Sequence, residues 1–169
     1  MKKLLITALA LSSFAGIAEE LKSYAQAKHK AYLIVKDYPG IFSSETAKDL
    51  QKKQAEALHK LAYEVSQNNN DVKELLQQKE GAFRYAKESG DYSDFHAVIK
   101  ELEKYMMENI KNNTSYQEFY SHWDQAVLSV EHHRLSKVRQ SDKAKLKKAY
   151  DFKQEKRRSA LSASVTVDI

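Results

Sequence analysis

Two groups of histidine and glutamate side chains have the residue types that could bind a metal ion. Glu56 and His59 form an E-x-x-H pair, the unit from which two-metal carboxylate sites in helical bundles are built. Such a site needs a second E-x-x-H sequence and two further inward glutamates, and the chain has no second copy. The apolar residues around the pair belong to another face of the expected helix, so both side chains should point to solvent. We therefore predict neither a metal site nor a cofactor here.

The second group lies further along the chain and contains His122, His132 and His133, with Glu118 and Glu131 nearby. These residue types bind zinc or respond to protonation. His132 and His133 are neighbours and point about 100° apart on a helix, so they do not form a simple helical chelate. The sequence has no glycine-rich phosphate loop, nucleophile elbow or H-E-x-x-H motif. We predict a non-enzymatic protein; an enzyme built from buried carboxylates in a bundle is a more distant alternative.

The strongest chemical feature is a basic segment near the end of the chain. Residues 134–158 contain 11 basic and 3 acidic side chains, whereas residues 19–133 contain 15 basic and 19 acidic ones. Clustered positive charges repel one another, so an anionic surface should neutralise them. That surface is either the remainder of the same chain or an external one: lipid headgroups, cell-wall polymer or nucleic acid. The candidate anion-binding residues are Arg134, Lys137, Arg139, Lys143, Lys145, Lys147, Lys148, Lys153, Lys156, Arg157 and Arg158.

The chain also contains ten tyrosines, a residue type that combines apolar area with a polar tip and is common at contact surfaces. Several fall on apolar stripes and are expected in the core. The others lie at loops or helix flanks and form a candidate surface for a protein partner of unknown identity: Tyr38, Tyr63, Tyr85 and Tyr92.

The elements that carry these residues are expected to be helices. The 169-residue chain has no cysteine, one proline and four glycines, and alternates like a strand only in its last residues. Residues 115–139 hold the clearest stripe, with apolar side chains recurring every three or four positions, and Ser115 with Glu118 predicts a capping box at its start. This stripe is the expected centre of the core and consists of Tyr116, Phe119, Tyr120, Trp123, Val127 and Val130.

Weaker helical patterns precede and follow this stripe, separated by short breaks at the Pro39-Gly40 pair, near residues 66–70 and near Gly90. Ser43 or Ser44 and Asp71 are the expected N-caps of the second and third helices. Helices joined by short loops usually lie antiparallel. We therefore predict an all-α, up-and-down bundle of four to five amphipathic helices over residues 19–140. A basic helix or arm with a short tail should follow over residues 141–169, after a break near residues 140–142.

The first eighteen residues have the order of a signal peptide. Two lysines precede about fifteen apolar or small residues, and charged residues begin abruptly at Glu19. We expect cleavage after Ala18; Ala25 and Ala27 offer a second position, after Ala27. A buried apolar N-terminal helix of a cytosolic protein is the structural alternative. The sequence Ile17-Ala18-Glu19 also resembles the short cleavage motif of tailed-phage head proteases.

Together these features predict an exported protein, periplasmic or secreted and of bacterial or phage origin. We expect it to act by binding a protein, with weak polyanion binding through its basic segment. The alternative is a nucleic-acid-associated or virion-internal basic structural protein with a processed leader. Nothing in the sequence indicates an oligomeric state, a partner or a pathway.

Overall fold

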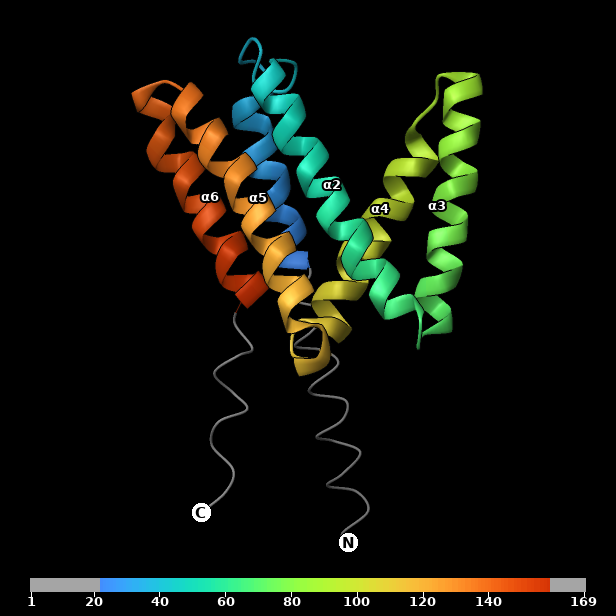
Figure 1. The fold of residues 1–169 in the computed structure, drawn as a ribbon. Helices are drawn as coiled ribbons and strands as arrows, with labels where there is room; N and C mark the ends of the chain where they lie inside the picture. Colours follow the sequence, from blue (N-terminus) through green and yellow to red (C-terminus); the bar gives the residue numbers. More distant parts are fainter. Residues whose placement is uncertain (1–21, 159–169) are drawn as a thin grey trace, which may run out of the picture.

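The computed structural model describes residues 22–158, and this part of the chain is helical throughout its regular elements (Figure 1). The prediction of an all-α fold is confirmed, and no strand occurs between residues 22 and 158. The first helix is described over residues 22–35, and the helices that follow it are α2 (Glu45–Ser66), α3 (Asn70–Ser89), α4 (Ser93–Tyr105), α5 (Gln117–Lys137) and α6 (Gln140–Arg158). The predicted signal peptide and the end of the predicted tail lie outside the described residues.

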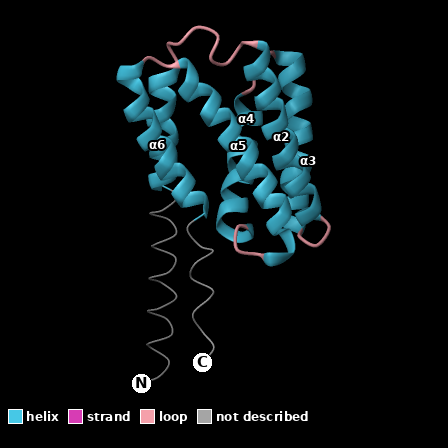
Figure 2. Ribbon diagram, turned by 60° about the vertical axis from the view of Figure 1, so that its left-hand side comes forward, coloured by secondary structure: helices cyan, strands magenta, loops and turns pink. Residues whose placement is uncertain are grey.

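The described chain has six helices, where the sequence predicted a bundle of four to five followed by a basic helix or arm. The sixth is the basic segment, which forms a full helix, α6, and packs on the remainder of the molecule. Figure 1 shows the chain reversing direction between successive helices, and Figure 2 shows that loops occupy the two ends of the helical layers.

The larger core surrounds Trp123, which is completely buried on α5. Its ring meets the Tyr120 ring edge to face at a centroid distance of 5.3 Å. Residues of the first helix, α2, α3, α4 and the π-helical turn η1 (Met106–Ile110) complete the same cluster. The stripe predicted over residues 115–139 therefore faces the core, with Tyr116 and Phe119 at its partly buried edge.

A smaller core holds α6 against the first helix. Leu146 and Tyr150 of α6 pack there with Ala31 and Val35 of the first helix. Ile41 of the following loop and Val138, which ends α5 in an extended conformation, close the cluster. The predicted break near residues 140–142 lies slightly earlier in the structure, because Val138 ends α5 and α6 begins at Gln140.

Two of the predicted helix starts differ from the structure by one or two residues. The third helix is capped by Asn69 rather than Asp71, since the Val72 amide donates to Asn69 Oδ1 over 3.0 Å. Ser115 lies inside a 3-10 turn, η2 (Thr114–Tyr116), and donates its amide to Asn113 Oδ1 over 3.0 Å. Asparagine is as good an N-cap as aspartate or serine, so residue preference alone could not separate these neighbours. The expected cap at Ser44 is confirmed by a 3.3 Å bond from the Ala47 amide.

Helices α3 and α4 form a hairpin that leans away from α2 towards its tip (Figure 1). Gly90 ends α3 in the left-handed conformation, with φ of 79°, which glycine adopts without steric cost. Phe83 of α3 and Phe95 of α4 contact each other across the hairpin at a centroid distance of 5.3 Å. Phe83 remains 39% exposed. The two phenylalanines of the hairpin therefore pack on each other, and part of the Phe83 ring remains exposed to solvent.

Removing the Trp123 ring should destabilise the fold strongly. We expect Trp123→Ala to lower the free energy of unfolding by about 3–5 kcal/mol, because a large ring leaves a cavity between packed helices. The neighbouring His122 is exposed. His122→Ala should therefore cost less than ~1 kcal/mol. Urea melts of both variants measure the difference, and equal losses would contradict the central position of Trp123.

Candidate functional site

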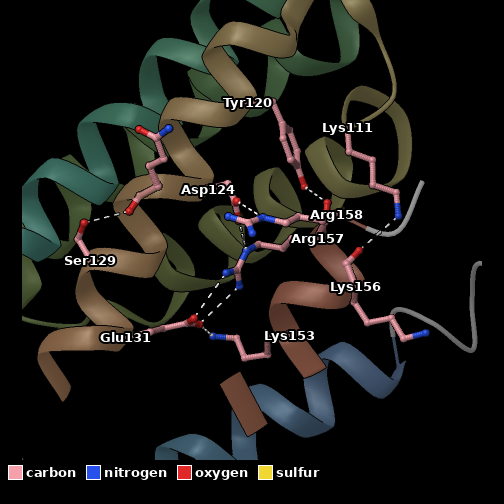
Figure 3. A network of polar contacts seen from close by, with 10 residues as sticks. Lys111, Tyr120, Asp124, Ser129, Glu131, Lys153, Lys156, Arg157 and Arg158 are labelled. Carbon is pink, nitrogen blue, oxygen red and sulfur yellow. Dashed lines mark hydrogen bonds and ion pairs between the residues drawn. The ribbon is translucent and has the colours of Figure 1, made fainter. Parts of the chain in front are cut away.

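Four charged side chains are buried between α5 and α6, next to the Trp123 core. Asp124 and Glu131 lie two turns apart on α5, and Lys153 and Arg157 lie one turn apart on α6. All four are at most 9% exposed, and Arg157 is completely buried. Helical spacing places each pair on one side of its own helix, so the two pairs face each other across the contact (Figure 3).

These side chains form a connected network of ion pairs. Arg157 Nε donates to Asp124 Oδ1 over 2.8 Å, and its terminal nitrogens lie 3.5 Å from the Glu131 oxygens. Lys153 Nζ donates to Glu131 over 2.6 Å. Arg158, about half exposed, reaches the second Asp124 oxygen over 2.7 Å. Figure 3 shows that these contacts all run between α5 and α6.

Backbone and tyrosine groups complete the network. The Tyr120 hydroxyl donates to the Arg157 carbonyl over 3.0 Å, which joins the Trp123 core to the end of α6. Burial raises the pKa of Tyr120 and of Tyr24, so both remain neutral phenols. Burial lowers the pKa of Lys153, and the Glu131 carboxylate opposes that change. Burial also acts against the charged form of Arg157, but the Glu131 and Asp124 carboxylates outweigh it and raise the pKa of this group.

The predicted anion-binding residues therefore fall into separate structural groups. Lys153 and Arg157 are buried and neutralised by α5, which is the intramolecular docking that the sequence left open. Lys147 pairs with Asp151 over 2.5 Å on the surface of α6. Arg134, Arg139 and Lys156 lie over the aromatic rings of Phe42, Tyr38 and Phe152 respectively. Among the remaining members, Lys143 is half-buried, whereas the exposed ones are Lys137, Lys145 and Lys148.

The four candidate partner tyrosines do not share one environment. Tyr63 on α2, Tyr85 on α3 and Tyr92 before α4 are exposed by 54%, 56% and 41%. Tyr38 is half-buried instead, and its hydroxyl contacts Asp142 and accepts a bond from the Arg139 amide over 3.1 Å. It therefore ties the loop after the first helix to the start of α6, whereas the other three candidates are exposed on α2 and the hairpin.

The metal-type residues are dispersed. Glu56 is exposed and its carboxylate lies 3.8 Å from Lys52, while His59 Nδ1 lies 3.2 Å from the Lys79 ammonium. Burial and the Lys79 charge lower the pKa of His59. Across residues 22–158, no three histidine, aspartate or glutamate side chains are grouped so that they could hold a metal ion. Within the same residues, no helix has the length and apolar character needed to cross a membrane.

An apolar cleft lies where the hairpin separates from α2. Its volume is about 320 Å³. Leu58 and Ala55 of α2 form one wall, and Phe83, Phe95 and Ile99 of the hairpin form the other. Two basic and two acidic side chains line its rim, namely Lys52, Lys79, Glu56 and Glu80. The cleft thus combines an apolar floor with a rim of no net charge.

The buried network can be tested by removing one charge. Glu131→Gln leaves Lys153 buried without its carboxylate, so we expect the free energy of unfolding to fall by about 3–5 kcal/mol. Asp151→Asn breaks an exposed pair within α6 and should cost less than ~0.5 kcal/mol. Denaturant melts of both variants provide the comparison, and a neutral Glu131→Gln change would show that the pairs made by Glu131 contribute little to holding α6.

The role of the buried network follows from its own geometry. Each carboxylate on α5 contacts a basic group on α6, so the network fixes the position of the last helix on the bundle. The apolar cleft and the exposed lysines of α6 are among the features that the network leaves open. No protein-family model, curated protein or solved structure matches this chain.

Proposed function

We propose that the protein is an exported, non-enzymatic binding protein, periplasmic or secreted, that holds a helical segment of a partner protein. The observation that supports this proposal best is the apolar cleft between α2 and the α3–α4 hairpin. In this proposal the remaining helices form an up-and-down scaffold that keeps the two walls of the cleft in place. The exported location rests on the order of residues 1–18.

The shape of the cleft favours a helix as its occupant. Both of its walls are helices, and an amphipathic helix laid between them would bury its own apolar face. A volume of about 320 Å³ accommodates two or three apolar side chains, which a helix supplies at positions three or four apart. The mixed charges of Lys52, Lys79, Glu56 and Glu80 would pair with the polar flanks of such a helix. Tyr85 and Tyr92 are also exposed on this hairpin, outside the lining of the cleft.

Phe83 offers the sharpest test, because it lines the cleft and is partly exposed. A photo-crosslinking residue in place of Phe83 should capture a specific protein in cells, and the captured peptide should come from a helix. Calorimetry with that purified protein should then show binding at least 10-fold weaker for Phe83→Asp, as expected for a lost aromatic anchor.

Leu33 provides the matched control, since it is 45% exposed on the first helix and does not line the cleft. Leu33→Asp should leave the measured affinity within 2-fold. Equal binding by the wild-type chain and the Phe83→Asp variant would exclude the cleft as the partner site. Capture of the same products from positions 33 and 83 would show that the crosslinks are non-specific.

A second candidate activity is polyanion binding through the outer side of α6. Lys145 and Lys148 lie about one turn apart and are both exposed, on the side away from Leu146 and Tyr150. This observation also supports the alternative of a nucleic-acid-associated or virion-internal structural protein. A chain that ends before α6 would lose the buried network as well, so substitution is a cleaner test than truncation.

Lys145→Gln/Lys148→Gln should reduce the slope of log affinity against log salt by about 2, because two phosphate contacts are lost. Lys60→Gln/Lys73→Gln removes the same charge from exposed positions on α2 and α3 and should leave the slope unchanged. Titrations of duplex DNA and of anionic vesicles at about 50 and 200 mM salt measure this slope. Phosphate contacts weaken strongly over that range of salt concentration. Stronger binding to DNA favours the nucleic-acid alternative, and equal effects of both pairs would indicate net charge alone.

A further inference from the structure

A separate cavity of about 230 Å³ lies among the first helix, α2, α5 and α6. Its lining is unlike that of the apolar cleft, because basic side chains reach it from three different helices: Lys28, Arg134 and Lys153. Ala31, Val127 and Val130 supply apolar wall between them. We propose that this cavity binds a small oxyanion, a phosphate or carboxylate group.

Two hydrogen-bond donors in the cavity lining lack acceptors. The Tyr150 hydroxyl and Arg134 Nε are both buried, and neither donor has an acceptor among residues 22–158, because the Arg134 guanidinium beside the Tyr150 oxygen is itself a donor. Tyr150 itself is only 3% exposed. A buried donor without an acceptor is destabilising, so folded proteins rarely leave two of them beside one cavity. An oxyanion accepts hydrogen bonds from both.

The Arg134 guanidinium is held in position for this role. It lies over the Phe42 ring at 4.9 Å from the centroid, and Phe42 also lines the cavity. It also lies beside the Tyr150 hydroxyl, so its positive charge and its side-chain contact with that oxygen both oppose the rise in the pKa of Tyr150 caused by burial. A stacked, planar guanidinium loses little freedom when it binds two oxygens of one carboxylate or phosphate.

The charges around the cavity favour an anion. Glu131 is the one carboxylate in its lining, and it is already engaged by Lys153 at 2.6 Å and by Arg157 at 3.5 Å. Lys28 pairs with Glu103. No carboxylate of the described chain forms an ion pair with Arg134. Arg134 is therefore the uncompensated charge, and a bound oxyanion would neutralise it in a site of lowered dielectric.

The size of the cavity limits the ligand. At roughly 30 Å³ for each water molecule, 230 Å³ corresponds to about eight waters. A phosphate ion or a short carboxylate fits with part of its hydration, whereas a polymer does not. The site is thus distinct from the outer lysines of α6 and from the partner cleft, and it does not depend on the function proposed for either.

Calorimetric titration of the full chain with sodium phosphate, at constant ionic strength maintained with sodium chloride, tests the proposal. We expect saturable binding, and a parallel titration with sodium acetate distinguishes a phosphate from a carboxylate site. Arg134→Gln should weaken binding at least 10-fold, and Tyr150→Phe, which keeps the packed ring, should weaken it several-fold. Both effects would reflect the loss of donors to the ligand.

The control is Arg139→Gln, which removes the same charge from a nearby exposed position. Its affinity should stay within 2-fold of the wild-type value. Absence of saturable binding of either anion would overturn the proposal, as would an equal loss of affinity in Arg139→Gln and Arg134→Gln. If the Tyr150→Phe variant and the Arg134→Gln variant both bind with wild-type affinity, the anion binds elsewhere, and the proposal is overturned.

Discussion

The pairing of Asp124 and Glu131 with Arg157 and Lys153 determines where the last helix lies. Charges removed from water are costly unless each meets a partner, so a shift of α6 by one turn would leave buried charges unpaired. Apolar contacts such as those of Leu146 tolerate sliding far better. The ion pairs therefore select one register, and the second core, the oxyanion cavity and the outward direction of Lys145 all follow from it.

The central stripe of the fold was predictable because large apolar residues at helical spacing form one face of a helix, and that face is stable only when it is buried in the core. Trp123 and Val127 illustrate this. The ion network was missed, although a signal for it exists: Asp124 and Glu131 are seven residues apart and adjoin the stripe, so one helix face carries both apolar and acidic groups. Lys153 and Arg157 likewise continue the spacing of Leu146 and Tyr150. Pairing between these faces is a tertiary property, and spacing within one helix cannot specify it.

The open cleft could not be predicted for a related reason. Phe95 and Ile99 belong to a regular apolar stripe, and the pattern is the same whether that stripe meets the core or a neighbouring helix. In the structure Phe95 packs on Phe83 within the hairpin, and Ile99 lies at the border between the cleft and the core. The choice depends on the angle between the hairpin and α2, which the spacing of residues within one helix does not specify.

The π-helical turn at the end of α4 sets the rotation of that helix about its own axis. The Lys111 amide donates to the Met106 carbonyl over 2.9 Å, five residues back, so the turn holds one residue more than an α-helical turn. This extra residue allows the consecutive Met106 and Met107 both to be buried. Loss of one residue there would restore α-helical phase and rotate everything upstream by about 100° relative to the core. Phe95 and Ile99 would then leave the cleft wall, so the length of this turn governs whether the molecule has a cleft at all.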